Sequence, residues 1–231
     1  MKLYSRALAI AGFWLCLGPS HAAELDTMAQ RMLPCATCHG AQGQATADGY
    51  YPRIAGKPAG YLYEQLLNFR DGQRQHAGMS YFLDRQRDAY LQQMAEHFAA
   101  QELPYPAPLA TKSSAASLAR GEVLVRKGDA LRKVPACNAC HGERLTGLQP
   151  AVPGLLGLPF DYITAQLGGW LVGVRHARAP DCMADIVKAL APGDIEVVAA
   201  WLAAQPVPLD AKAPRGEIST DRHCGSLEPR Q

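Results

Sequence analysis

The chain has 231 residues, of which 48% are hydrophobic and 19% charged, and its formal net charge at pH 7 is +2. Loss of Lys2 and Arg6 with an N-terminal leader would leave 21 of the 23 basic residues against 21 acidic ones, so the charge balance does not favour a nucleic-acid partner. Beyond the leader no segment reaches about 18 uninterrupted apolar residues, so we expect no membrane span.

Residues 1–22 are typical of a secretory signal peptide. Lys2 and Arg6 precede an apolar run from Ala7 to Leu17, and small residues follow it. Cys16 lies inside the run and would be discarded with it. We therefore expect a protein that is exported to the periplasm through a cleaved signal peptide.

The first half of the mature chain carries a motif for covalent haem attachment. A helix expected over residues 24–32 leads into the sequence Cys35-Ala36-Thr37-Cys38-His39-Gly40. In a helical turn, thiols at i and i+3 and an imidazole at i+4 share one face. The thiols can add to the two vinyl groups of a porphyrin while the histidine ligates its iron. The motif predicts a c-type haem.

The elements that follow alternate loops with helices. Apolar spacing predicts a helix over 61–69, and a polar loop over 70–78 then leads to Met79. An amphipathic helix is expected over 85–100. Residues 103–112 contain three closely spaced prolines and predict an extended linker.

The second half repeats the first. After a helix expected over 117–127, Cys137-Asn138-Ala139-Cys140-His141-Gly142 forms a second attachment motif. Residues 56–66 match 157–167, and residues 91–101 match 195–205, so the chain is interpreted as a tandem duplication. Asp194 is the expected N-cap of a last helix over 195–204, and a polar tail follows.

No strand-like alternation stands out, so the predicted fold class is all-α, with two tandem haem domains joined by a Pro-rich linker. The predicted organisation is a signal peptide (1–22), a first domain (23–102), the linker (103–112), a second domain (113–205) and a C-terminal tail (206–231).

Two other interpretations of the cysteine pairs are a zinc site and a pair of thioredoxin-like redox couples. A zinc ribbon requires no histidine after each pair, and a thioredoxin-like couple requires a strand and a helix around it. Two covalent haems therefore account best for Cys35, Cys38, Cys137 and Cys140.

The repeat also nominates the second axial ligands. Aligning the final helices at a fixed offset of 104 places Met79 opposite Met183, each in a loop between two helices. A methionine thioether favours ferrous iron and raises the potential. We therefore predict that His39 and Met79 hold one iron, and that His141 and Met183 hold the other.

Other side chains near these methionines could compete. His76 and His176 would give bis-histidine sites, and Cys182 could offer a thiolate. However, Cys182 and Cys224 are left over by the haem motifs, and in an oxidising compartment we expect them to form a disulfide.

The paired C-x-x-C-H-G motifs, each followed by a Pro-containing segment, a Tyr-x-x-x-Gln-Leu helix and a late methionine, resemble the cytochrome c4 family of two-haem class I cytochromes. The resemblance implies that the two haem domains are tandem class I cytochrome c domains. It also implies that the carbonyls of Pro52 and Pro153 accept the ring N–H groups of the two haem-ligating histidines. It also makes Arg74 and Arg175 candidates for contact with haem propionates.

These features predict a carrier that accepts electrons from a respiratory donor and passes them to a terminal acceptor such as a terminal oxidase. Two six-coordinate irons leave no open position for a substrate, so we expect no enzyme activity. One alternative is a catalytic two-haem enzyme, peroxidase-like or thiosulfate-oxidising, in which one iron lacks Met or is held by Cys182. Another is a tightly bound cytochrome subunit of a membrane dehydrogenase or oxidase.

Overall fold

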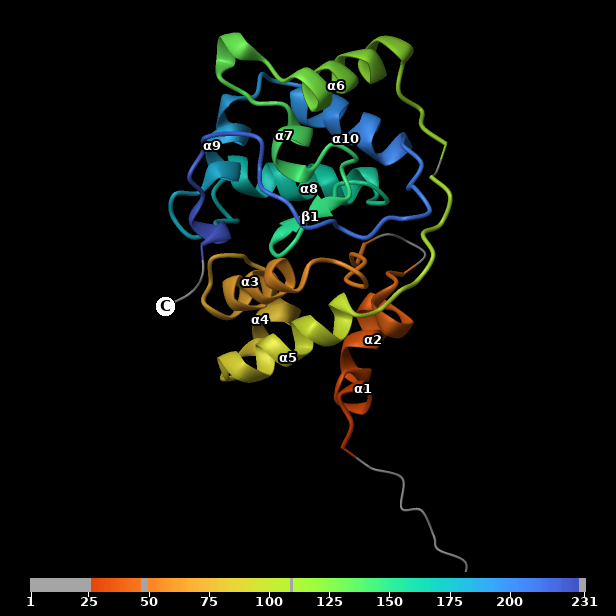
Figure 1. Ribbon diagram of the computed structural model, residues 1–231, viewed down its shortest axis with the longest axis vertical. Coiled ribbons are helices and arrows are strands. Elements are labelled where there is room, and N and C mark those ends of the chain that lie inside the picture. The colour runs from red at the N-terminus through yellow and green to blue at the C-terminus, as the bar shows by residue number, and fades with distance from the viewer. Residues whose placement is uncertain (1–25, 47–49, 109, 229–231) are drawn as a thin grey trace, which may run out of the picture.

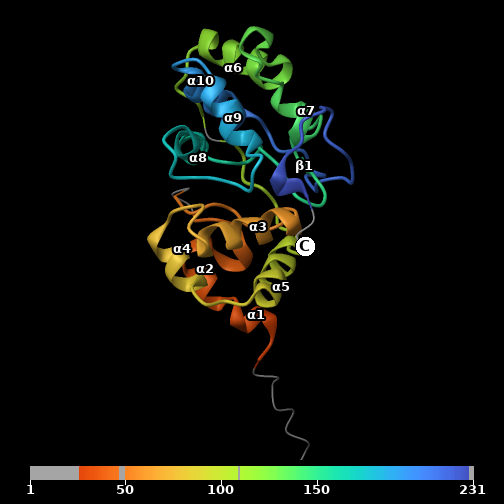
Figure 2. The same ribbon diagram turned by 90° about the vertical axis from the view of Figure 1, so that its left-hand side faces the viewer.

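The computed structural model describes residues 26–46, 50–108 and 110–228, and these residues form two helical lobes that follow one another along the chain (Figure 1). The view turned by 90° shows the same two lobes stacked end to end (Figure 2). The predicted signal peptide, residues 1–22, lies outside the described residues.

Five α-helices build the described part of the first lobe. They are α1 (Met28–Arg31), α2 (Leu33–His39), α3 (Ala59–Arg70), α4 (Ala77–Leu83) and α5 (Asp88–Ala99). The helix predicted over 24–32 begins later than expected, at Met28 after its N-cap Thr27, and after its end at Arg31 a separate helix carries the haem motif. The reason for the break is Pro34, which lacks an N–H donor and is therefore accommodated in the first turn of α2.

The core of the first lobe lies between α3 and α5. Leu91, Ala95 and Phe98 recur on one face of α5 and are buried, as the predicted amphipathic pattern requires. They pack with Leu62 and Leu67 of α3. This packing fixes the two helices that flank the segment containing Met79.

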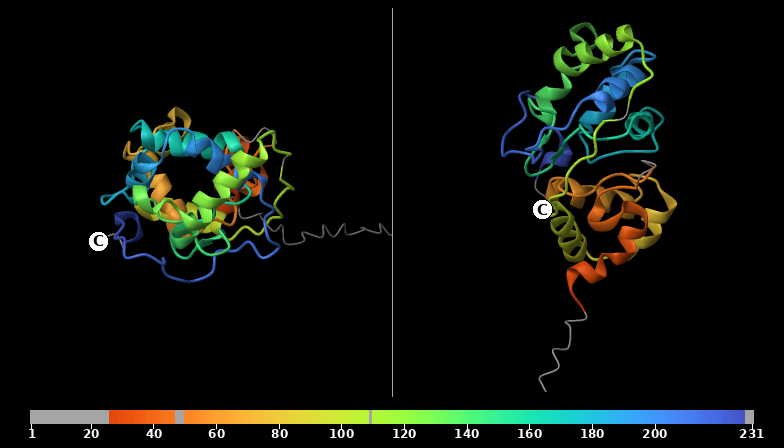
Figure 3. Two further views of the ribbon diagram at one scale, coloured as in Figure 1. Left: turned by 90° about the horizontal axis from the view of Figure 1, so that it is seen from above. Right: turned by 90° about the vertical axis from the view of Figure 1, so that its right-hand side faces the viewer.

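Between α5 and α6 (Ala115–Lys127), the described residues form neither helix nor strand, and this connection passes along the side of the two lobes (Figure 3). Its first residues are held by Arg53, whose guanidinium donates to the Pro104 carbonyl at 3.1 Å and stacks on the Tyr105 ring. The proline-rich segment is thus anchored to the first lobe.

The second lobe repeats the helical order and adds a short hairpin. Its elements are α6, α7 (Cys137–His141), β1 (Gly147–Leu148), β2 (Val152–Pro153), α8 (Phe160–Leu171), α9 (Cys182–Ala189) and α10 (Asp194–Ala204). The two-residue strands are antiparallel and were not expected from the sequence. The helical fold class is nevertheless confirmed.

The crossing of α6 over α10 depends on a glycine. A Cβ atom at Gly121 would lie 2.1 Å from the Val197 carbonyl oxygen and 2.8 Å from the Cβ of Trp201. The two backbones therefore approach as closely as only glycine allows. Around this contact Leu124, Val125 and Leu202 are almost fully buried, and they form the centre of the core of the second lobe.

Three other expectations about local structure are wrong. Met79 and Met183 do not lie in loops, because each occupies the first turn of a short helix, α4 or α9. Asp194 is the first residue of α10 and not its N-cap, which is Gly193. The Asp194 carboxylate instead accepts a hydrogen bond from the Ala191 N–H and pairs with Arg120.

Candidate haem-binding sites

The first attachment motif lies at the end of α2. Cys35, Cys38 and His39 occupy its last turns, and Gly40 then turns the chain with φ of +74°. A Cβ atom at Gly40 would lie 2.4 Å from the Ala45 carbonyl oxygen. The glycine that follows the histidine is therefore required by the turn itself.

The second motif repeats this geometry in α7, which ends at His141, and Gly142 has φ of +81°. The four motif cysteines are half-buried and form no disulfide. Burial raises the pKa of the Cys137 thiol to about 12. Within the described residues no cluster of three or more His, Cys, Asp or Glu side chains could hold a metal ion.

Both motif histidines are oriented by a proline carbonyl. Nδ1 of His39 lies 2.9 Å from the Pro52 oxygen, and Nδ1 of His141 lies 2.8 Å from the Pro153 oxygen. Since a carbonyl only accepts, Nδ1 carries the proton and Nε2 keeps its lone pair. Burial also lowers the pKa of both imidazoles, which favours the neutral form that an iron ligand requires.

In the first lobe Met79 is half-buried in α4. His76, which could compete with it, is the N-cap of that helix, and its exposed side chain accepts the Met79 N–H through Nδ1 at 3.3 Å. The histidine therefore has a local structural role, and it helps to fix the helical turn that carries the methionine.

In the second lobe Met183 is the second residue of α9 and is half-buried. Cys182 precedes it and forms a disulfide with Cys224, as predicted. This bond removes Cys182 as a thiolate ligand. His176 is exposed, with Nε2 donating to the Gly173 carbonyl at 2.8 Å, and it lies seven residues before the methionine.

Arg74 and Arg175 meet where the two lobes contact each other, and their backbones pair as an antiparallel bridge. Each guanidinium binds the glutamine of its own lobe and that of the other lobe. Arg74 donates to Gln65 at 2.9 Å and also to Gln166, and Arg175 donates to Gln166 at 2.8 Å and to Gln65 at 3.1 Å.

Tyrosines complete the cluster with the same twofold pattern, because Arg74 binds Tyr162 and Arg175 binds Tyr61. The sequence motif Tyr-x-x-x-Gln-Leu marked these residues as a repeat without revealing that each copy binds the arginine of the other lobe. Only the folded arrangement brings them together.

The cluster contains two cations without an anion. Arg74 and Arg175 are 9% and 6% exposed, and neither forms an ion pair with a carboxylate of the described residues. Burial, together with the nearby Arg74, lowers the pKa of Arg175 to about 10. Arg175 also stacks on Trp170, whose buried Nε1 finds no hydrogen-bond partner in the described part of the chain. Uncompensated cations and a free donor suit the carboxylates of haem propionates.

Two of the other contacts between the lobes involve buried charged side chains that sequence reasoning missed. Arg178 of the second lobe pairs with the buried Glu64 of α3 at 3.1 Å. Lys57 of the first lobe is 6% exposed, and its Nζ donates to the Gly154 carbonyl at 3.5 Å. Nothing in the sequence signalled that Lys57 is buried, since lysine is usually a surface residue.

Comparison with known proteins agrees with this geometry. A model of the cytochrome c family matches residues 29–104. A thiosulfate dehydrogenase electron acceptor from Thiomonas intermedia is 36% identical over 174 residues, covering 75% of this chain and 79% of that relative. The crystal structure of cytochrome c4 from Pseudomonas stutzeri matches with a TM-score of 0.65 at 26% identity, over 76% of this chain and 95% of that one.

The chain belongs to the cytochrome c4 family of two-haem class I cytochromes c. It therefore carries two covalently bound c-type haems and transfers electrons. This cytochrome also resembles a thiosulfate dehydrogenase, TsdBA, from Marichromatium purpuratum, with a TM-score of 0.66 and 31% identity. That match covers 74% of this chain but only 36% of the Marichromatium chain. None of the described helices is long and apolar enough to cross a membrane.

Proposed function

We propose that this cytochrome is exported to the periplasm and carries electrons between a respiratory donor and a terminal acceptor. In this proposal Cys35 and Cys38 attach the first haem, and Cys137 and Cys140 attach the second. His39 and Met79 ligate one iron, and His141 and Met183 ligate the other. The observation that carries the proposal is the repetition of one arrangement in both lobes: a histidine with a free Nε2 and a methionine in the first turn of a short helix.

The surrounding residues orient the sites and connect them. The Pro52 and Pro153 carbonyls hold the imidazoles at one tautomer and orientation, which favours ligation through Nε2. Arg74 and Arg175, shared between the lobes, would bind propionates from both haems at the interface. When bound, each haem would supply one-electron redox chemistry. Haems whose propionates reach this shared cluster would exchange electrons without a diffusional step.

The same ligand set argues against catalysis. If histidine and methionine both ligate each iron, no open position would remain there for a substrate. Cys182 cannot replace Met183 while it is bonded to Cys224. We therefore propose a carrier without enzyme activity of its own.

Replacement of each methionine tests the ligand assignment. Met79→Ala and Met183→Ala should each remove half of the absorption band that methionine–iron bonds produce in the oxidised protein. Each variant should also bind added imidazole at one haem. Met28→Ala is the matched control, because Met28 is half-buried beside the core of the first lobe and is not a proposed ligand. A full band in either ligand variant would refute the assignment of that methionine.

A second candidate function specifies which protein donates electrons to this cytochrome. The Thiomonas relative is a thiosulfate dehydrogenase electron acceptor, and the Marichromatium structure is a thiosulfate dehydrogenase. Formation of a sulfur–sulfur bond between two thiosulfate ions releases two electrons, and two haem irons accept one each. This cytochrome would then be the acceptor of such an enzyme.

The donor can be identified by rapid mixing. The oxidised cytochrome is mixed with thiosulfate alone, with a thiosulfate dehydrogenase alone, and with both. Reduction of both haems only when enzyme and substrate are present together would support the acceptor role. Equally fast reduction by thiosulfate alone would show that no separate dehydrogenase is needed and would contradict the acceptor role.

A further inference from the structure

The C-terminal tail, residues 206–228, has no counterpart in the first lobe, where the chain enters the linker after α5. The tail crosses the second lobe past β1 and α7 and reaches the start of α9 (Figures 1 and 2). Its backbone is held along the way, since the Gln149 N–H donates to the Pro214 carbonyl at 2.8 Å. The tail is therefore a bound part of the second lobe.

Midway, the tail binds the haem-attachment helix. The Ser219 N–H donates to the carbonyl of Ala139, which lies between the two motif cysteines, at 2.6 Å. The next residue, Thr220, hydrogen-bonds the Cys140 thiol through its side chain. Arg222 then donates to the Lys133 carbonyl at 3.1 Å. These contacts connect the tail to the side of the site that carries His141.

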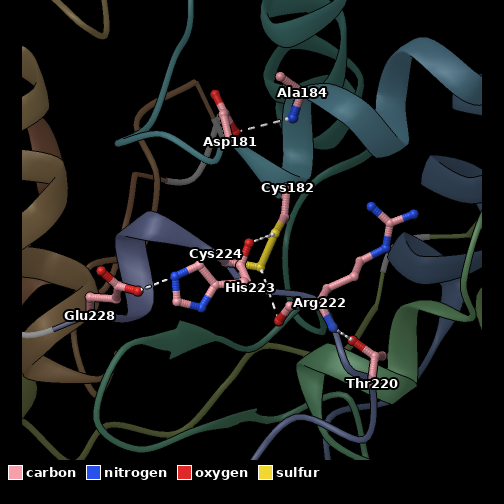
Figure 4. Close-up of a disulfide and its surroundings, with 8 residues drawn as sticks. All are labelled: Asp181, Cys182, Ala184, Thr220, Arg222, His223, Cys224 and Glu228. Carbon is pink, nitrogen blue, oxygen red and sulfur yellow. Dashed lines mark hydrogen bonds and ion pairs between the residues drawn. A yellow bond between two sulfur atoms is a disulfide. The ribbon is translucent and has the colours of Figure 1, made fainter.

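Further on, the tail binds the helix that carries Met183. Cys224 is bonded to Cys182, the residue before that methionine and the first residue of α9 (Figure 4). The Gly225 N–H donates to the Pro180 carbonyl at 3.0 Å. A Cβ atom at Gly225 would lie 2.2 Å from the Ala179 carbonyl oxygen, so the tail packs directly against the segment that leads into α9.

The N-cap of α9, Asp181, is the other local anchor of this segment, because it accepts the Ala177 N–H at 2.7 Å. It also accepts the Ala184 N–H at 3.1 Å, and the helix has only eight residues (Figure 4). Short isolated helices are marginal in water, so their position depends on tertiary contacts. In the first lobe the residue before Met79 is Gly78, which has no covalent tether. The disulfide therefore distinguishes the two methionine segments.

We propose that the tail ties α7 to α9 across the second site, and that Cys224, through its bond to Cys182, is a positioning residue that holds Met183 on the second iron. This inference rests on the proposed ligation by Met183. A thioether is a weak ligand for iron. How firmly it stays bound depends on how far the segment that carries it can move once the bond to iron is broken. A cross-link removes such freedom and so raises the effective concentration of the ligand at the metal.

The test uses the haem-loaded double variant Cys182→Ser/Cys224→Ser. Its second haem should bind imidazole about tenfold more tightly than in the native protein, because Met183 is displaced more easily. Its first haem should be unchanged. The methyl signals of the iron-bound methionines in the reduced protein, assigned with Met79→Ala and Met183→Ala, report which ligand is lost. Asp210→Asn is the matched control, since it removes only an exposed tail ion pair with Arg144.

A second variant leaves the disulfide in place. Gly225→Ala should push the segment at Ala179 outward and also strengthen imidazole binding at the second haem. Unchanged imidazole affinity at the second haem in whichever of the two variants folds with both haems would overturn the proposal. If the native protein gave no methionine signal from the second haem, ligation by Met183 would be refuted instead. The signal therefore distinguishes failure of the tail proposal from failure of the proposed ligation.

Discussion

Replacing Lys57 by methionine should stabilise the folded cytochrome at neutral pH, although it removes a hydrogen bond. Lys57 is almost completely buried, and within the described residues it has no anionic partner. Burial, the larger cause, and the nearby Arg53 lower the pKa of Lys57 from its ordinary value of 10.5 to about 8. At the equivalent position of the second repeat the chain has Leu158, which shows that an apolar side chain fits the motif.

The size of the effect follows from linkage. A pKa that is lower in the folded than in the unfolded state by 10.5 minus 8, or about 2.5 units, corresponds to about 3 kcal/mol at 1.36 kcal/mol per unit. The long hydrogen bond to Gly154 offsets about 1 kcal/mol of this. We therefore expect Lys57→Met to raise the free energy of unfolding by about 2 kcal/mol at pH 7.

The sign of the pH dependence is a sharper test. Between about pH 8 and 10.5 the unfolded chain keeps the Lys57 proton and the folded chain has lost it. The stability of the native protein therefore rises with pH in this window, and the advantage of the variant should shrink by about 3 kcal/mol. Denaturant unfolding of both proteins at a series of pH values measures the difference, with the exposed Lys112→Met as control. If the difference in free energy of unfolding between the two proteins stayed constant with pH, the reasoning would be refuted. Lys57 would then keep its proton in the folded protein, as a lysine beside an anion does.

Three further outcomes are expected. Gly121→Ala should lower the free energy of unfolding by about 2 kcal/mol, because its Cβ would overlap Val197. Gly168→Ala is the control and should be nearly neutral, because the space around Gly168 is open. Equal effects of the two substitutions in urea unfolding would contradict the close helix crossing. Arg178→Ala should cost about 2 kcal/mol, since it deprives the buried Glu64 of a partner, while Arg85→Ala at an exposed pair should cost less than about 0.5 kcal/mol. Cys35→Ala/Cys38→Ala should leave one covalent haem by mass spectrometry, and two would refute the attachment assignment.

Sequence patterns predicted the parts of the fold that depend on regular burial. The inward face of α5, with Leu91 and Phe98, follows from its spacing. Helices α4 and α9 were missed because they are short and bury few residues. In α4 only Leu83 is buried, and its N-cap is a histidine, which is not a common capping residue. A pattern of apolar residues cannot predict a helix that contributes little to the core.

The site was predictable where it is local and not where the lobes meet. The attachment motifs lie within single helical turns, so their spacing alone indicates the chemistry. The matched arginines were recognisable as a pair, but their binding of both Gln65 and Gln166 depends on the contact between lobes. Burial of Lys57 depends on the same contact and left no trace in the sequence.

Because Lys57 reaches across this contact, a residue of the first lobe should change the midpoint potential of the second haem. Its Nζ binds the carbonyl of Gly154, the residue after Pro153, whose own carbonyl orients His141. The first haem receives no equivalent charge from the second lobe, because the second-lobe residue that corresponds to Lys57 is the uncharged Leu158. A positive charge favours the ferrous state, which carries one positive charge fewer than the ferric state.

An interaction of about 1 kcal/mol, typical for charges in a partly buried setting, corresponds to about 40 mV for one electron. Lys57→Met should therefore lower the midpoint potential of the second haem by tens of millivolts and leave the first nearly unchanged. Redox titration at pH 7, with the haems distinguished through the Met79→Ala and Met183→Ala variants, measures both potentials. Equal shifts at the two haems would show that Lys57 acts through the overall charge of the protein and not through its contact with the second site. A shift confined to the second haem would mean that the duplicated sites acquire different potentials from the residues by which the two repeats differ.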